Sequence, residues 1–361
     1  MRATKAIIDL AAIRHNLESV KQFAPDSKVM AVVKADAYGH GIVKTALSLN
    51  NADAIAVACL DEAITLREAG VQSEIVLLEG FFSVEELNLA LEFNLQTVIH
   101  QQSQLEQLEM ASKTHPEKNI DVWLKLDSGM NRLGFFKDSF EEAVAAVKNL
   151  PIVNKVNLMS HLACADDIEN DMSNRQIQQF RAVTDKYALP RSMANSAGVV
   201  AWPESHFEWT RPGIMLYGCS PMIGFTGEQH QLKPAMTLRS QLFAIHHLKA
   251  GETVGYGASW RAQKDTRIGV IAIGYGDGYP RHAKNGTPVL IKGKKYPLVG
   301  KVSMDMITVD LGNEDTFELG ETAILWGEGL AVEEVAKFAD TIPYTLLCSV
   351  TSRVKFEWIN D

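Results

Sequence analysis

The sequence predicts an α/β protein with an N-terminal (β/α)8 TIM-type barrel followed by a smaller, mainly antiparallel β domain. Its 361 residues exceed the usual size of a single domain. Between about residues 29 and 218, short apolar runs alternate with helical patterns, as in parallel α/β folds. From about residue 231 onward, β-branched runs broken by glycine replace that alternation. We therefore expect a barrel over 1–232 and a β domain over 233–361, with roughly the first eight residues able to join the β domain.

Eight short apolar runs predict the strands of the barrel. The segments between them carry apolar residues at helical spacing, and Asp or Ser opens several of them as a helix cap, for example in DEAITLREAG and SVEELNLALEF. Eight strand and helix units within about 200 residues favour a closed barrel over a doubly wound sheet. The expected strands are 29–33, 54–58, 74–79, 96–99, 121–126, 155–161, 191–195 and 207–211.

The last third of the chain predicts a β domain because its apolar runs are rich in β-branched residues and are separated by glycine. No short repeat, low-complexity segment or coiled-coil pattern interrupts this region or the one before it. The runs are MTLRSQLFAIHHL, RIGVIAIGYGDGYP, TPVLIKGKKYPLVG, SMDMITVDLG and ETAILWG.

Composition favours a small-molecule substrate. The chain has 35 basic and 44 acidic residues, a formal net charge of -9, and no basic block, which argues against nucleic acid or an anionic membrane surface as a partner. No apolar run approaches the roughly 18 residues needed to span a membrane, and Asp9 interrupts the N-terminal segment before an export signal can form. The four cysteines form no CxxC pair, which favours reduced thiols. We expect a cytoplasmic protein.

Polar residues end or directly follow five of the expected barrel strands. In (β/α)8 barrels the carboxyl ends of the strands meet on one rim, where the chemistry gathers. One polar residue there would mean little, but several that converge on the same rim indicate a binding or catalytic site. These residues are Lys34, Asp127, His161, Asn195, Ser196 and Arg211.

Lys34 lies in the stretch AVVKADAYGHG, directly after an apolar run and before two glycines that interrupt regular structure. A lysine amine in an apolar site can form a Schiff base with a carbonyl, either on the substrate, as in aldolases, or on pyridoxal phosphate (PLP). Asn195, Ser196 and the stretch 211–214 close the last two barrel strands, where barrels commonly bind phosphate. Tyr38 could add a hydroxyl. A phosphate site favours PLP over direct attack on the substrate.

Eight motifs along the chain together resemble those of the bacterial alanine racemase family. The match covers both expected domains, and the combination is far more specific than any single motif. The resemblance implies PLP-dependent interconversion of L- and D-alanine, supply of D-alanine for peptidoglycan, and a head-to-tail homodimer. The motifs, in chain order, are AVVKADAYGHG, KLDSGMNRLGF, SHLACAD, NSAG, RPGIMLYG, GETVGYGASW, IGYGDGYPR and VGKVSMDMITVD.

The resemblance implies two bases, because racemisation removes a proton from one face of Cα and returns it to the other. Lys34 matches the lysine that binds PLP and serves one face. Tyr256 matches a tyrosine that the partner subunit supplies to the other face. Arg211 matches an arginine that faces the pyridine nitrogen and leaves it unprotonated, since guanidinium does not readily release a proton. His161 resembles the residue that supports this arginine.

Further residues match cofactor and substrate positions of the family. Arg132 matches the arginine that binds the substrate carboxylate, and Lys125 matches a lysine that is carbamylated in many members and orients that arginine. Tyr275 and Arg281 match residues at the substrate entrance. Lys301 replaces an arginine that is common at its position, which removes a planar fork of donors. The matches to the cofactor site are Tyr38, Asn195, Ser196, Gly213, Ile214 and Tyr344, and those to substrate contacts from the partner are Met304 and Asp305.

Four other interpretations agree less well with the sequence. A PLP decarboxylase with the same domain plan usually carries a glycine-run phosphate loop and a cysteine-acid motif, which this chain lacks. A non-catalytic PLP-binding protein would not need the β domain that carries Tyr256. A cofactor-free Schiff-base aldolase would leave the phosphate site without a use. His161, Cys164 and Asp166 could suggest a metal, but nothing else in the sequence supplies a ligand cluster, so we expect none.

Overall fold

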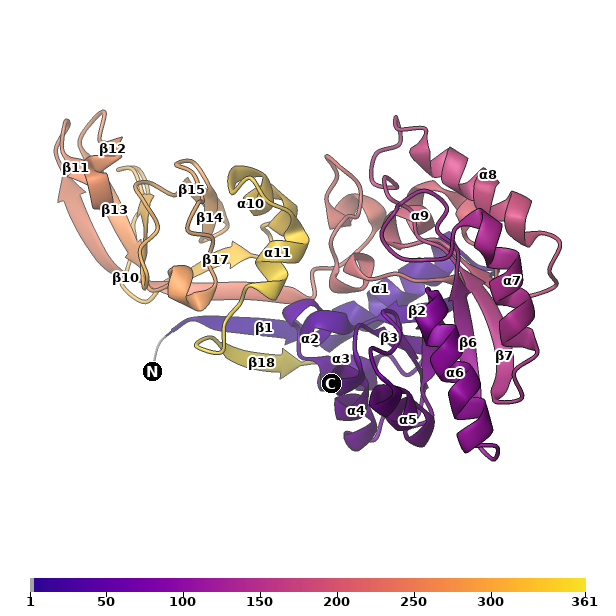
Figure 1. The fold of residues 1–361 in the computed structure, drawn as a ribbon. Coiled ribbons are helices and arrows are strands. Elements are labelled where there is room, and N and C mark those ends of the chain that lie inside the picture. Colours follow the sequence, from indigo (N-terminus) through magenta and orange to yellow (C-terminus); the bar gives the residue numbers. More distant parts are fainter. Residues whose placement is uncertain (1–2) are drawn as a thin grey trace.

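The computed structural model describes residues 3–361, which form two domains side by side (Figure 1). The barrel lies at the right of the figure and the β domain at the left, with α2 (Lys34–Gly39) and α11 (Pro343–Cys348) between them. The predicted fold class, a TIM-type barrel with a mainly antiparallel β domain, is confirmed. No helix within residues 3–361 is long and apolar enough to cross a membrane.

Eight parallel strands close the barrel, and each one overlaps one predicted run. The strands pair in sequence order, and Lys28 of the first pairs with Trp209 of the last, which completes the circle. Nearly every residue of the first five strands is buried, because side chains pack both inside the barrel and beneath the helices. The strands are β2 (Lys28–Val32), β3 (Ala54–Val57), β4 (Glu74–Leu77), β5 (Gln96–Ile99), β6 (Ile120–Lys125), β7 (Val153–Met159), β8 (Arg191–Ser192) and β9 (Trp209–Thr210).

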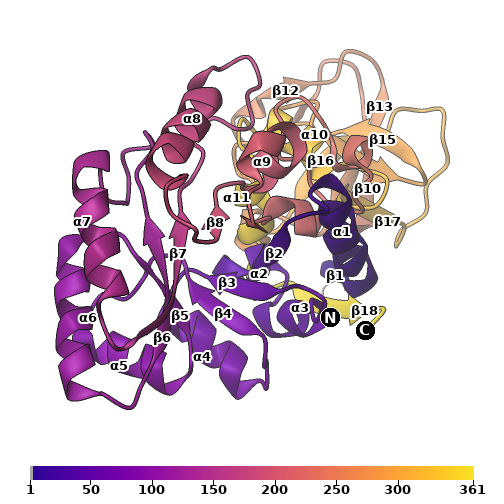
Figure 2. The same cartoon turned by 90° about the vertical axis from the view of Figure 1, so that its right-hand side faces the viewer.

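Amphipathic helices cover the outside of the barrel (Figure 2). In α7 (Lys137–Lys148) the buried residues recur every three or four positions from Phe140 to Val147, so they share one face. Ser83 caps α5 by accepting a hydrogen bond from the Glu86 amide at 3.2 Å. The other helices of this domain are α1 (Leu10–Phe23), α3 (Ile42–Ser48), α4 (Leu60–Glu68), α5 (Val84–Glu92), α6 (Gln102–Thr114), α8 (Met172–Thr184), α9 (Ser196–Ala201), η1 (Pro203–Ser205), η2 (Ile214–Tyr217) and η3 (Gly227–His230).

The β domain is built on β10 (Met236–Leu248), a strand of 13 residues. It pairs antiparallel with β1 (Lys5–Asp9), β13 (Thr266–Ile271) and β17 (Thr322–Trp326) along its length. The sheet order is β15-β14-β17-β10-β1-β18, and β13 also pairs with β16. The remaining elements are β11 (Thr253–Val254), η4 (Tyr256–Ala258), β12 (Trp260–Arg261), β13 (Thr266–Ile271), η5 (Tyr275–Asp277), β14 (Pro288–Ile291), β15 (Lys294–Pro297), β16 (Ile307–Asp310), β17 (Thr322–Trp326), α10 (Val332–Phe338) and β18 (Lys355–Ile359).

The first strand, β1 (Lys5–Asp9), lies in the sheet of the β domain although it precedes the barrel in the sequence. It pairs antiparallel with β10 and parallel with β18. Asp9 then caps α1, because its Oδ1 accepts hydrogen bonds from the amides of Ala11 and Ala12 at 2.9 and 3.2 Å. The chain therefore passes from the sheet into the barrel and later returns, which links the two domains twice.

The two domains meet where α11 packs on α2. A Cβ at Gly39 would clash with the carbonyl of Leu347, and Gly39 has a φ of 79°, so this close approach requires glycine. Trp358 Nε1 donates to the His40 carbonyl at 2.9 Å across the same junction. These contacts bring α11, and with it Tyr344, to the mouth of the barrel.

Candidate active site

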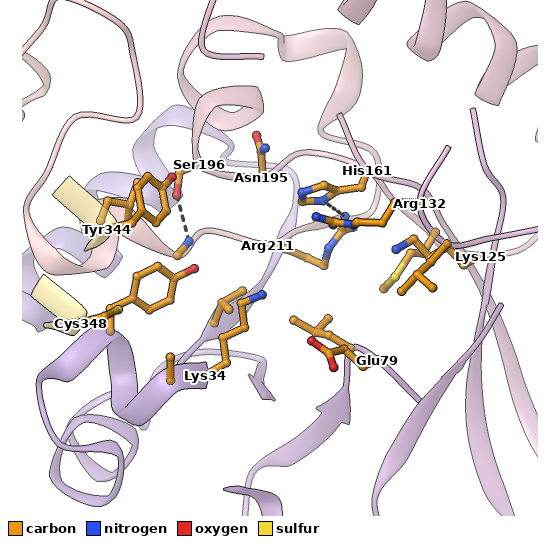
Figure 3. A pocket seen from close by; sticks show the side chains of 18 residues that line it. Lys34, Glu79, Lys125, Arg132, His161, Asn195, Ser196, Arg211, Tyr344 and Cys348 are labelled. Carbon is orange, nitrogen blue, oxygen red and sulfur yellow. Dashed lines mark hydrogen bonds between the residues drawn. The ribbon is translucent and has the colours of Figure 1, made fainter. Parts of the chain in front are cut away.

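A cavity of about 510 Å³ opens at the carboxyl ends of the barrel strands, the rim that the sequence predicted. In Figure 3, Lys34 and Glu79 reach into it from one side, and Arg211, His161 and Asn195 lie across from them. The predicted site residues that line this cavity are Lys34, Tyr38, Lys125, Arg132, His161, Asn195, Ser196, Arg211, Gly213, Ile214 and Tyr344.

Lys34 begins a left-handed turn. The φ angles of residues 35–38 lie between 52° and 54°, a region that costs non-glycine residues about 1 kcal/mol or more each. The Ala35 amide donates to Glu62 Oε1 at 2.7 Å, which helps to hold the turn. Backbone in such a conformation gathers at functional sites. The turn brings the side chains of Lys34 and Tyr38 into one cavity.

The cavity is strongly cationic. Lys34, Lys125, Arg132 and Arg211 line it, and Glu79 is the one acidic side chain that does so among the described residues. The side chain of Lys125 is buried, with only 8% of the residue exposed. Burial, followed by the charges of Arg211 and Arg132, lowers the pKa of Lys125 from 10.5 to about 8. At neutral pH a far larger fraction of this amine is neutral than in an exposed lysine.

Arg211 is fixed by hydrogen bonds at the base of the cavity. It donates to the Ser192 hydroxyl at 2.6 Å and to the carbonyls of Ser160 and Met193 at 2.5 and 3.3 Å. Burial lowers its pKa to about 10, so it remains a cation at neutral pH. Burial and then the Arg211 charge hold the pKa of His161 well below its usual value. The neutral His161 ring accepts a hydrogen bond from Arg211 at Nδ1 over 3.3 Å, which assigns the ring proton to Nε2.

Hydroxyl groups gather at another part of the cavity. Ser196 Oγ accepts hydrogen bonds from the amides of Gly213 and Met215 at 2.9 and 3.3 Å. A Cβ at Gly213 would clash with the Tyr38 hydroxyl, so glycine lets that hydroxyl approach the backbone. The Tyr344 ring lies 5.7 Å from the Tyr38 ring, centroid to centroid. Burial raises the pKa of both tyrosines, so their hydroxyls stay protonated and can donate.

This donor set fits pyridoxal phosphate. The hydroxyls of Tyr38, Ser196 and Tyr344 line the cavity, and those of Tyr38 and Ser196 lie beside Gly213, where a Cβ would take the space of the Tyr38 hydroxyl, which suits a phosphate group. The amine of Lys34 could react with an aldehyde, and the fixed cation of Arg211 would suit a ring nitrogen. The carbonyl oxygen of the Asn195 side chain is already in use, since it caps α9 by accepting from the Gly198 amide at 2.9 Å.

Asp127 and the predicted site residues of the β domain other than Tyr344, including Arg281, do not line the cavity. Tyr256, Tyr275, Met304 and Asp305 all lie on the β domain. Tyr256 is 68% exposed and sits in η4, beside β11 and β12, which Figure 1 shows at the end of the β domain farthest from the barrel. Tyr275 and Met304 are also exposed. The Tyr275 amide donates to the Ser303 carbonyl at 3.0 Å, so these two segments are neighbours.

Among the lining residues with ionisable side chains, sequence reasoning missed Glu79 and Cys348. Glu79 ends a predicted strand, which is the signal that singled out the other rim residues. Cys348 lies on α11, and no local pattern connects that helix to the barrel. Asp127, which the sequence placed on the rim, has another task. Its Oδ1 accepts from the Asn131 amide at 3.1 Å, so it orders the loop that carries Arg132.

The fold and the site together give the class of protein. It has a (β/α)8 barrel joined to a β domain, and a site at the barrel mouth that is built around the lysine after the first strand. The family description "alanine racemase, N-terminal domain" matches residues 8–221, and "alanine racemase, C-terminal domain" matches residues 235–358. The chain belongs to the alanine racemase family, and the resemblance drawn from its motifs is confirmed.

Similar proteins align over nearly the whole chain. Alanine racemase from Aeromonas hydrophila subsp. hydrophila is 51% identical over 362 residues, which cover 99% of this chain and 100% of the relative. Alanine racemase from Vibrio parahaemolyticus is 49% identical over 359 residues, 99% of each chain. The crystal structure of the biosynthetic alanine racemase from Pseudomonas aeruginosa matches with a TM-score of 0.95 and 44% identity, again over 99% of each chain.

Proposed function

We propose that this protein interconverts L-alanine and D-alanine with PLP as cofactor, and that two subunits together form each active site. One observation carries the proposal. The barrel cavity holds Lys34 and a fixed Arg211, whereas Tyr256 stands exposed at the far end of the β domain. Family membership supports alanine as the substrate. It also supports the supply of D-alanine for peptidoglycan as the biological role. The same family membership does not favour the decarboxylase alternative.

The side chains of the cavity would hold PLP at three points. Lys34 Nζ would bind the aldehyde carbon, and the hydroxyls of Tyr38, Ser196 and Tyr344 would donate to the phosphate. When bound, PLP serves as an electron sink that makes the Cα proton of an amino acid more acidic. Arg211 would face the pyridine nitrogen without giving up a proton to it, which would disfavour transamination.

Two groups of the protein would move the Cα proton. Lys34 Nζ serves one face of Cα, and the hydroxyl of Tyr256 of the partner subunit serves the other. In one direction Lys34 accepts the proton that the tyrosine replaces from the opposite side, and in the reverse direction the two groups exchange tasks. Neither base alone can invert the centre, because a proton returned by the same group reforms the original enantiomer.

Arg132 would bind the substrate carboxylate, and Lys125 would orient Arg132. A pKa of about 8 leaves roughly a tenth of the Lys125 amine neutral at pH 7, and a neutral amine can attack CO2. A bond forms between Nζ and the carbon, one amine proton leaves to solvent, and a carbamate anion results. The same cations that lower the pKa of Lys125, those of Arg211 and Arg132, would stabilise this anion.

The exposed face around Tyr256 supports a homodimer. Met304 is 52% exposed, and Tyr275 and Tyr256 are exposed on the same domain. Large apolar side chains exposed together usually mark an interaction surface. A head-to-tail dimer would set this face of each subunit over the cavity of the other, and would satisfy the need for a second base.

A visible spectrum of the purified protein, combined with a chiral assay on alanine, tests the proposal. We expect absorbance from lysine-bound PLP. We also expect the same final ratio of L-alanine to D-alanine whichever enantiomer is supplied. Lys34→Ala is expected to lose both the absorbance and the activity. Tyr256→Phe is expected to keep the absorbance and lose racemisation. A colourless protein, or racemisation retained by either variant, would contradict the proposal. Deuterium exchange at alanine Cα separates catalysis from simple PLP binding.

A further inference from the structure

Two loops of the β domain form one unit. Residues 274–277 carry Tyr275, and residues 303–306 carry Met304 and Asp305. The amides of Tyr275 and Gly276 donate to the carbonyls of Ser303 and Met304 at 3.0 and 2.9 Å. A Cβ at Gly274 would clash with the backbone of the second loop, so the two backbones are in direct contact. We call residues 274–277 and 303–306 the two-loop unit.

Arg353 joins the two loops through its side chain. Its Nη2 lies 2.7 Å from Asp305 Oδ1, and its Nε lies 3.5 Å from Asp277 Oδ1. The guanidinium also packs against Gly276, where a Cβ would clash with Nη1. The turn before β18 that carries Arg353 is itself attached to the first loop, because the Thr351 amide donates to the Asp277 carbonyl at 3.1 Å.

The chemistry of these contacts calls for an arginine. Asp277 is 0% exposed and accepts from the Gly274 amide at 3.0 Å, and a buried carboxylate is costly without a cation. The hydrogen bond to Asp305, followed by the charges of both aspartates, raises the pKa of Arg353. A planar guanidinium can face two carboxylates at once, whereas a lysine ammonium has no such fork.

We propose that Arg353 is a positioning residue for the substrate-carboxylate end of the active site, acting through Asp305 and the two-loop unit. This inference rests on the proposed function, in which Met304 and Asp305 contact the substrate bound by the partner subunit. Arg353 fixes the position of residues 303–306 relative to residues 274–277. The second loop is therefore already ordered where it meets the active site of the partner subunit. Such preorganisation acts on binding of substrate more than on the proton transfers.

The test compares Arg353→Ala and Arg353→Lys with Lys355→Ala. The control removes the same charge two residues away, where Lys355 pairs with Glu357 at 2.9 Å on the surface. Arg353→Ala is expected to raise KM for L-alanine by about tenfold and to lower kcat by less than about threefold. Arg353→Lys, which keeps the charge without the fork, is expected to raise KM by about threefold. Lys355→Ala is expected to match the wild type.

Two further measurements exclude a merely structural effect. Asp305→Asn is combined with Arg353→Ala, and if Arg353 acts through Asp305 the double variant is no worse in KM than the poorer single variant. In the PLP-free protein, hydrogen exchange at the amides of Tyr275 and Gly276 is expected to accelerate about tenfold in Arg353→Ala and less in Arg353→Lys.

The outcomes separate this inference from the proposed function. Additive effects of Arg353→Ala and Asp305→Asn on log KM, or unchanged exchange of the two amides, would overturn the role of Arg353 while wild-type racemisation stands. Wild-type protein that cannot racemise alanine would instead overturn the proposed function. If Arg353→Ala does not fold, the KM and exchange of Arg353→Lys decide, and values equal to those of Lys355→Ala would refute the inference.

Discussion

The shared active site predicts that two inactive variants restore each other. Lys34→Ala removes the amine from the cavity, and Tyr256→Phe removes the hydroxyl from the exposed face. Each homodimer lacks one base at both of its sites. Loss of one positioned general acid or base typically costs about 10²- to 10⁴-fold in rate, so we expect both pure variants to be almost inactive. A dimer with one subunit of each kind differs from both.

In the hybrid dimer, one of the two sites is complete. The Tyr256→Phe subunit supplies an intact Lys34, and the Lys34→Ala subunit supplies an intact Tyr256 across the interface. The other site lacks both groups. Random exchange of equal amounts of the two variants makes half of the dimers hybrid, so the mixture is expected to regain about one quarter of the wild-type activity. Hybrid dimers isolated through two different affinity tags are expected to reach about one half.

The assay is a chiral measurement of D-alanine formed from L-alanine, with the PLP content of each preparation read from its visible absorbance. Subunits are exchanged by co-expression, so that no refolding step is needed. As a control, Lys34→Ala is paired with the double variant Lys34→Ala with Tyr256→Phe, and this hybrid contains no intact lysine. If Tyr256 acts within its own subunit, both sites of every hybrid are incomplete. Doubly tagged hybrids that hold PLP and remain inactive would therefore refute the shared site.

Three further predictions concern the cavity. Lys125→Met is expected to raise the free energy of unfolding of the PLP-free protein by up to about 3 kcal/mol at pH 7 in CO2-free buffer. The reason is that the pKa of Lys125, lowered from 10.5 to about 8, means that the charged amine destabilises the folded state. Denaturant titrations at several pH values check the sign, since the penalty is complete below pH 8, shrinks as the pH rises toward 10.5 and is absent above it. Gly213→Ala is expected to weaken PLP binding by about tenfold or more, measured by absorbance titration, because the new methyl group displaces the Tyr38 hydroxyl, and unchanged affinity would argue against the phosphate cradle. Glu79→Gln removes the one negative charge among the described lining residues. It is expected to tighten the binding of propanoate, a carboxylate anion, about threefold to tenfold in competition assays. Weaker binding would show that Glu79 contacts the ligand directly.

The sequence predicted the barrel well because parallel strands are buried on both faces. Such strands are continuous apolar runs, and runs like 29–33 and 54–58 are visible without any long-range information. The rim residues followed from the strand ends, since the barrel topology brings all carboxyl ends together. The same logic applies to Glu79, which ends the expected strand 74–79 as His161 and Arg211 end theirs, although the prediction did not include it.

Other features have no local signal. The left-handed turn at residues 35–38 contains no glycine, and it exists because contacts such as that of the Ala35 amide with Glu62 hold it. The pairing of Lys5 with Lys355 joins residues from opposite ends of the chain, which no periodicity reveals. Composition and residue spacing likewise could not predict that Tyr256 lies far from the cavity of its own barrel. Only the motif resemblance linked Tyr256 to the active site.

The β domain would serve two active sites at once, and its orientation on the barrel would therefore control both. Through α11 it places Tyr344 in the cavity of its own subunit, and under the proposed dimer it carries Tyr256 to the cavity of the other. Both placements depend on the junction at which Gly39 packs against the Leu347 carbonyl. A side chain at Gly39 would push α11 away from α2, so it would loosen the phosphate cradle of one site and misplace the base of the other. A defect in PLP affinity and a defect in proton transfer are then expected to appear together, although residue 39 belongs to neither set of reacting groups.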